Sequence, residues 1–142
     1  MWNIADMVQI DVLYEGALHC IATHLPSGTT LTTDAPVDNQ GKGESFSPTD
    51  LVATALGTCI ATTMDIYARR KKIDLTGMRI TVKKEMSTAA PRRIAQLTTE
   101  IWFPLKLSSD PERSLEKVAL TCPVHHSLSS KVAKPISFHY LE

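Results

Sequence analysis

The sequence of 142 residues lacks a surplus of charge of either sign. Fifteen Lys and Arg balance fifteen Asp and Glu, so the formal net charge is zero. Proteins that bind nucleic acid or an anionic membrane surface through their overall charge carry a basic surplus. We therefore expect neither nucleic acid nor a membrane among the partners, and a small uncharged ligand is favoured.

Two further features are scarce, namely cysteine and export signals. Three cysteines are too few for a disulfide scaffold, so we expect reduced thiols. Residues 1–10 contain Asp6 and lack the basic segment and the apolar run of about 7–15 residues that a secretory signal needs. No repeat or linker interrupts the chain. The sequence thus predicts one cytoplasmic domain spanning residues 1–142.

One long helix is well signalled in the middle of the chain. Ser47 is suited to the N-cap, Asp50 follows it three residues later as in a capping box, and basic residues at 69–72 suit a helix C-terminus. The stretch 51–64 contains no charged residue but is shorter than the roughly 20 apolar residues of a membrane span. We predict a helix from Pro48 to Lys72 that is buried in a protein core.

Alternating apolar residues predict strands on both sides of this helix. The expected elements are a hairpin of Val8–Tyr14 and Ala17–His24 turning at Glu15-Gly16, a strand at Leu31, an antiparallel pair of Met78–Met86 and Arg93–Phe103, a helix beginning near Ser109 to Pro111, and a closing strand Ile136–Leu141. This order is typical of an α+β fold with helices on one face of an antiparallel sheet.

Cys122 is the most informative single residue. Pro123 disfavours a helical backbone at Cys122 and is itself suited to begin a helix, so Cys122 is predicted to be an N-cap. A thiol at a helix N-terminus is expected to have a lowered pKa, and His125 and His126 would add positive charge or a proton donor. The alternative is a small buried hydrophobic residue at a helix junction.

Cys59 lies within the uncharged helix. It shares a stripe of three- and four-residue spacings with Val52, Ala55, Leu56, Thr63 and Ile66, which favours a core position. Cys20 is assigned no role. A zinc site formed by Cys122, His125 and His126 is a further reading, but a second Cys-x-x-Cys motif is missing, so neither a metal nor a cofactor is expected.

Two segments carry a resemblance to a known family. The sequence SPTDLVATALGTC, from Ser47 to Cys59, is similar to the helix that bears the first cysteine of the OsmC/Ohr family. The sequence CPVHHSL, from Cys122 to Leu128, is similar to the second cysteine motif of that family and begins 63 positions after Cys59. The resemblance extends over nearly the whole chain.

The resemblance implies an OsmC-like fold, in which antiparallel sheets wrap around two central helices of an intertwined homodimer. It also implies thiol peroxidase activity of the kind used in the oxidative stress response. By position, Cys59 would attack an apolar organic hydroperoxide and become a sulfenic acid, and Cys122 would resolve it as a disulfide. A dithiol reductant, lipoyl-type in the best-known branch, would restore the thiols.

The sequence departs from the family pattern around the first cysteine. Peroxidase members supply an arginine from the N-terminal strands, but no arginine precedes Arg69 here. The partner glutamate of that arginine is replaced by Thr49, and Asp50 or Glu44 would stand in for it. The supporting candidates are therefore Asp50, Glu44, Thr49 and His125. Two hypotheses follow. The protein is either a peroxidase using Cys59 and Cys122, or an OsmC-like ligand-binding or redox-sensing protein without efficient turnover.

Overall fold

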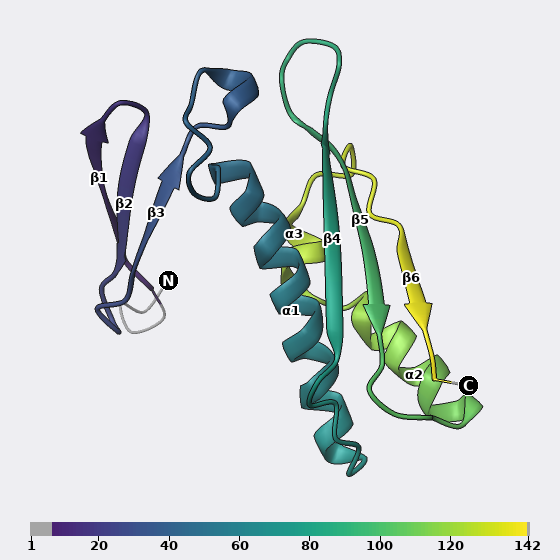
Figure 1. Ribbon diagram of the computed structural model, residues 1–142. Coiled ribbons are helices and arrows are strands. Elements are labelled where there is room, and N and C mark those ends of the chain that lie inside the picture. Colours follow the sequence, from purple (N-terminus) through teal and green to yellow (C-terminus); the bar gives the residue numbers. More distant parts are fainter. Residues whose placement is uncertain (1–6, 142) are drawn as a thin grey trace. The chain divides into compact units, whose positions relative to one another are not determined.

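The computed structural model describes residues 7–141, which form two compact units (Figure 1). One unit comprises the residues up to Leu51, and the other comprises the residues from Val52 onward. The segment considered for an export signal begins outside the described residues. Each unit has its own three-stranded sheet.

The N-terminal unit contains an antiparallel sheet in the order β1 (Ile10–Gly16), β2 (His19–His24) and β3 (Thr30–Asp34). The hairpin and the third strand agree with the sequence prediction. The turn, however, falls at Ala17-Leu18 and not at Glu15-Gly16. Ala17 and Leu18 both have positive φ angles, 53° and 62°. A two-residue turn of this geometry usually carries Asn-Gly or Asp-Gly, so its sequence signal is missing here.

A buried carboxylate organises the loop that follows β3. Asp34 is 4% exposed, pairs with His19 of β2, and accepts the backbone N–H of Glu44 at 3.1 Å. The loop includes a short 3-10 helix, η2 (Val37–Asn39). These hydrogen bonds satisfy a polar group that would be costly to bury without partners, and they anchor the loop that leads the chain into the long helix.

The long helix, α1 (Pro48–Arg70), begins as predicted. Asp50 N–H donates to Ser47 Oγ at 3.1 Å and Ser47 N–H donates to Asp50 Oδ2 at 2.9 Å, which is a capping box. The helix ends two residues earlier than expected, and Lys72 adopts a left-handed φ of 57°. By length and composition alone α1 is apolar enough to cross a membrane, a weak indication because core helices meet the same criterion.

The C-terminal unit contains a mixed sheet of β4 (Arg79–Met86), β5 (Ile94–Trp102) and β6 (Ile136–His139). β4 and β5 are antiparallel, as predicted, but β6 runs parallel to β5. The prediction of wholly antiparallel sheets was therefore wrong for this strand. The reason is the connection: α2 (Ser109–Ala119) and α3 (Pro123–Ser127) lie between β5 and β6 and form the helical crossover that a parallel pair requires.

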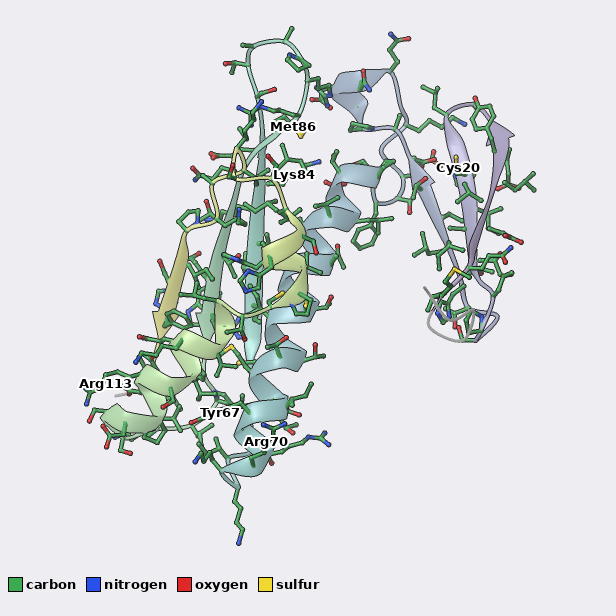
Figure 2. The ribbon with its side chains drawn as sticks, turned by 180° about the vertical axis from the view of Figure 1, so that it is seen from behind. Cys20, Tyr67, Arg70, Lys84, Met86 and Arg113 are labelled. Carbon is green, nitrogen blue, oxygen red and sulfur yellow. The ribbon has the colours of Figure 1, made fainter. Side chains whose placement is uncertain are left out.

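The core of the C-terminal unit lies between the helices and this sheet, and in Figure 2 the helices lie in front of the strands. The buried stripe of α1 consists of Ala53, Leu56, Gly57, Ile60, Met64 and Ala68. The predicted stripe was correct for Leu56, which is buried, but wrong for Ile66, which is 60% exposed, and Cys59 is half-buried. An uncharged helix segment has apolar residues on several faces, so spacing alone did not select the face that packs.

Candidate functional site

Cys122 occupies the junction between α2 and α3. Its backbone is extended, with φ −54° and ψ 127°, and Pro123 is the first residue of α3. The Cys122 Sγ accepts a hydrogen bond from the His125 backbone N–H at 3.5 Å, so the predicted N-cap is confirmed. The side chain is completely buried.

Cys59 lies on the half-buried flank of α1, beside the α3 segment. Its Sγ is 3.9 Å from the Thr63 Oγ1 one helical turn further on. The Cys122 side chain and the Val124 backbone are also near enough to shift its pKa by hydrogen bonding. Both cysteines are free thiols. The structure therefore brings together two sulfurs that lie 63 positions apart in the sequence.

The two thiols have opposite pKa shifts. Burial raises the pKa of Cys59, but hydrogen bonds from the Cys122 side chain, the Val124 backbone N–H and the Thr63 hydroxyl outweigh burial and lower it overall. Burial is also the largest influence on Cys122, and donation of its S–H to Cys59 adds to burial, so the pKa of Cys122 is raised. Cys59 is thus the thiol that ionises first.

The expectation that the helix N-terminus would lower the pKa of Cys122 was wrong. The His125 N–H does favour the thiolate, but burial and the adjacent Cys59 have the larger effect. His125 does not add positive charge either. Burial, followed by repulsion from Lys134 and His126, lowers the pKa of its imidazole, which is therefore neutral at neutral pH.

The other supporting candidates belong to the N-terminal unit. Asp50 forms the capping box with Ser47, and Thr49 Oγ1 lies 3.2 Å from Ser47 Oγ. Glu44 contributes its backbone N–H to the buried carboxylate of β3. None of these three residues is among the groups that shift the pKa of Cys59.

Sequence reasoning missed the contribution of Thr63 and Val124. Thr63 was placed on the expected core stripe, although its i+4 spacing from Cys59 also signals a side-chain contact on one helix face. Val124 contributes only its backbone, and no residue-type signal identifies a backbone donor. Its position, two residues after an N-cap, is the only indication that its N–H is unpaired within the helix.

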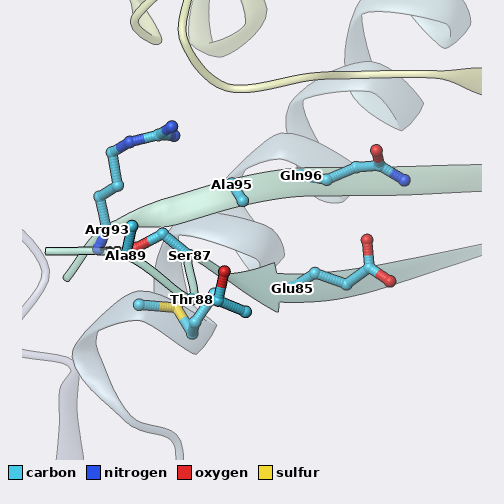
Figure 3. A pocket seen from close by; sticks show the side chains of 8 residues that line it. Glu85, Ser87, Thr88, Ala89, Arg93, Ala95 and Gln96 are labelled. Carbon is cyan, nitrogen blue, oxygen red and sulfur yellow. Dashed lines mark hydrogen bonds between the residues drawn. The ribbon is translucent and has the colours of Figure 1, made fainter.

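An open pocket of about 700 Å³ lies at the turn between β4 and β5 and involves neither thiol (Figure 3). Glu85, Ser87, Arg93 and Gln96 are among its lining residues. The Arg93 guanidinium donates to the backbone carbonyls of Ile94 and Lys131, at 3.1 and 3.2 Å, so it already serves to join the hairpin to a later loop.

Two other sequence readings can be located. Cys20 lies on β2 in the N-terminal unit, as Figure 2 shows. Within residues 7–141, no group of three or more His, Cys, Asp or Glu side chains is arranged to hold a metal ion. The three residues of the predicted zinc site contact one another instead. The Cys122 sulfur accepts the His125 backbone N–H, and the rings of His125 and His126 meet edge-on.

The structure thus defines an α+β protein with two three-stranded sheets, a long central helix and a pair of neighbouring thiols. The chain belongs to the OsmC-like family, whose model matches residues 41–134. No sequence among curated proteins matches the chain. The resemblance inferred from the two cysteine segments is therefore confirmed at the level of the family.

Solved structures agree with this assignment. A protein of Psychrobacter arcticus 273-4, named as a candidate osmotic stress induced and detoxification response protein, is 41% identical, with a TM-score of 0.89 over 94% of this chain and 96% of that one. The Legionella pneumophila organic hydroperoxide resistance protein OsmC is 16% identical, with a TM-score of 0.76 over 96% and 99%. An OsmC-like protein of Mycoplasma pneumoniae is 18% identical, with a TM-score of 0.77 over 98% and 100%. At these lower identities the likeness concerns the fold.

Proposed function

We propose that the protein is a thiol peroxidase that reduces organic hydroperoxides through Cys59 and Cys122. The observation that carries the proposal is the contact between a thiol of lowered pKa and a buried thiol of raised pKa. A peroxide-reducing thiol must be ionised to act as a nucleophile, and its partner must be close enough to form a disulfide. The names of the hydroperoxide resistance relatives point in the same direction.

In the first step the Cys59 thiolate attacks one oxygen of the hydroperoxide. An S–O bond forms and the O–O bond breaks, so sulfur is oxidised to a sulfenic acid while the peroxide leaves as an alcohol after taking up a proton. Because Cys122 stays protonated beside it, the Cys122 S–H stabilises the Cys59 thiolate before the reaction. The half-buried position of Cys59 on an apolar helix suits an apolar hydroperoxide.

In the second step Cys122 resolves the sulfenic acid. Its sulfur forms a bond to the Cys59 sulfur, and the hydroxyl leaves as water with the proton of the Cys122 thiol. A dithiol of the lipoyl type then reduces the disulfide by two thiol exchanges and becomes a cyclic disulfide itself. All electrons come from this dithiol, so the cycle uses thiols alone.

The proposal includes a homodimer. The chain leaves large apolar side chains exposed in both units, such as Ile66 at 60% on α1 and Val12 at 65% on β1. On β1 the neighbouring Leu13 is also exposed, so apolar residues lie on both faces of the strand. Exposed apolar surface of this extent is typical of chains that associate with a second copy.

The activity is tested by following consumption of cumene hydroperoxide with dihydrolipoamide as the reductant. The wild type should turn over faster than an equal concentration of free thiol. Cys59→Ser should reduce the rate by about 10³-fold or more, because the nucleophile is lost. Cys122→Ser should still consume one equivalent of hydroperoxide but should not turn over, and Cys20→Ser is the matched control that keeps the wild-type rate.

The alternative function has a distinct outcome in the same assay. The groups that shift the pKa of Cys59 include no cation, and a ligand-binding or redox-sensing protein needs no fast thiolate. The alternative is favoured if the wild type turns over no faster than free thiol and Cys59→Ser has the same rate as the wild type. This result would end the peroxidase proposal.

A further inference from the structure

The groups that lower the pKa of Cys59 are neutral hydrogen-bond donors. The groups that lower its pKa are the Cys122 side chain, the Val124 backbone N–H and the Thr63 hydroxyl, and no cationic side chain of the described residues is among them. A thiolate at this position is therefore stabilised by dipoles, where a full positive charge would otherwise be expected.

Thr63 lies one helical turn after Cys59, where its hydroxyl can donate to the Cys59 sulfur. The side chains of helical residues lean toward the N-terminus of the helix, so a residue at i+4 lies over the residue one turn before it. The Thr63 Oγ1 is 3.9 Å from the Cys59 Sγ, and both side chains are half-buried. Such a contact is long for the neutral thiol and is expected to shorten when the sulfur becomes charged.

The two threonines nearest to Cys59 in the sequence, Thr58 and Thr62, donate their hydroxyls to backbone carbonyls. Thr58 donates to the backbone carbonyls of Thr54 and Ala55, at 2.8 and 3.3 Å. Thr62 donates to those of Thr58 and Cys59, at 3.1 and 3.2 Å. Thr63 differs from both, since the partner of its hydroxyl is the Cys59 sulfur and not a backbone carbonyl.

We infer that Thr63 is a hydrogen-bond donor to the reacting sulfur, holding the Cys59 thiolate in the place of a charged residue. Thr63 would act while Cys59 is a thiolate, which is the state before the hydroperoxide is attacked. The inference goes beyond the proposed function because it concerns the ionisation of Cys59, which is measurable whether or not hydroperoxides are substrates.

The experiment measures the rate at which iodoacetamide alkylates Cys59 between pH 5 and pH 10. The full-length protein carries Cys20→Ser and Cys122→Ser, so that only Cys59 reacts. In this background Thr63→Val should slow alkylation at pH 7 by about three- to tenfold, which corresponds to the net contribution of one ordinary hydrogen bond. The difference between the two proteins should shrink as the pH rises toward 10, because a growing share of the sulfur is then ionised in both of them.

Two matched variants make the result specific. Thr63→Ser keeps the hydroxyl and should restore the rate at pH 7. Thr62→Val removes the same groups from the adjacent, exposed residue and should leave the pH profile as it was. Equal pH profiles for Thr63→Val and Thr62→Val would overturn the inference, and so would a failure of Thr63→Ser to restore the rate.

The outcome is independent of the peroxidase assay. Alkylation uses no hydroperoxide and no dithiol, so an absent peroxidase activity leaves this measurement intact. Conversely, an active enzyme with an unchanged Thr63→Val profile would overturn the role of Thr63 alone. Valine and threonine have nearly the same shape, so α1 should be retained in each variant. Far-ultraviolet circular dichroism checks this expectation.

Discussion

Cys122 and Cys59 show why residue-level reasoning must weigh several influences on one pKa. The cap position of Cys122 was read correctly from Pro123, but the expected lowering of its pKa was not found. A helix of five residues offers few aligned peptide dipoles, whereas complete burial removes water from the sulfur. The neighbour with fewer local signals, Cys59, has the lowered pKa.

These shifts predict an order of reaction in the wild-type protein. With a limiting amount of iodoacetamide at pH 7, Cys59 should be alkylated about tenfold or more ahead of Cys122, because a lowered pKa leaves more thiolate at that pH. The preference should shrink as the pH rises through the pKa of Cys122. Peptide mass spectrometry measures both products.

The Cys122 donor can be removed in the same assay. Cys122→Ala should slow the alkylation of Cys59 at pH 7, while Cys122→Ser, which keeps a hydroxyl donor, should slow it less. Modification of Cys122 before Cys59 in the wild type would contradict the assignment of the two pKa shifts. Cys20, in the N-terminal unit, serves as the internal reference thiol.

The proximity of the two thiols was predictable from sequence. The family resemblance singled out Cys59 and Cys122, and the structure places each of them near enough to shift the pKa of the other. Their support was not predictable, because it comes from a backbone N–H at Val124 and from a threonine that looks like any other in a threonine-rich helix. Asp50, which was considered in place of the missing glutamate, and Thr49, which stands at the position of that glutamate, interact with Ser47 at the helix start.

At the scale of elements, α1 packs closely on the sheet of the C-terminal unit through Gly57. A Cβ built at Gly57 would lie 3.0 Å from Val82 Cγ2 and 3.7 Å from Ile80 Cγ2 of β4. Glycine lowers helix propensity by roughly 1 kcal/mol relative to alanine. Its presence in the middle of α1 is therefore explained by the approach of helix and strand.

Gly57→Ala should consequently destabilise the protein by about 1–2 kcal/mol in spite of its higher helix propensity, because the added methyl group meets Val82. Val82→Ala removes the opposing methyl groups, and in that background Gly57→Ala should be neutral or stabilising. Urea unfolding of the four proteins of this double-mutant cycle measures the coupling. Equal effects of Gly57→Ala in both backgrounds would show that contact with Val82 is not the cause.

The direction of β6 illustrates what strand patterns leave open. Alternation located the strand, and the structure begins it at Ile136 as expected. Alternation is the same for parallel and antiparallel neighbours, however, so it did not reveal that β6 pairs in parallel with β5. The two helices that precede β6 were the relevant information, since they provide a crossover and not a hairpin.

At the scale of the whole molecule, the family and the α+β class were predictable because two cysteine segments and the helix caps are local signals. The division into two sheets was not, since strand pairing depends on contacts distant in sequence. Apolar side chains remain exposed in each unit. Exposed apolar side chains on both units are the basis for proposing a dimer, because a contiguous apolar surface is typical of an interaction site.

The dimer is tested by size-exclusion chromatography with light scattering. The wild type should elute with twice the mass of one chain, and Ile66→Glu should shift it toward the monomer, because burying a carboxylate in an apolar interface is costly. Thr88→Glu, at the exposed turn between β4 and β5, is the control and should remain dimeric. A monomeric wild type at tens of micromolar would refute the proposal.

Because Cys122 caps α3, the oxidation state of its sulfur should affect the stability of this short helix. The sulfur that accepts the His125 N–H is the same sulfur that would be joined to Cys59 after a catalytic cycle. A sulfur bonded in a disulfide is turned toward its partner and is a poorer acceptor, so the short helix would lose its cap whenever the pair is oxidised. Oxidation would then loosen residues 123–127, so the dithiol reductant would meet a different backbone conformation in the disulfide form than in the reduced form.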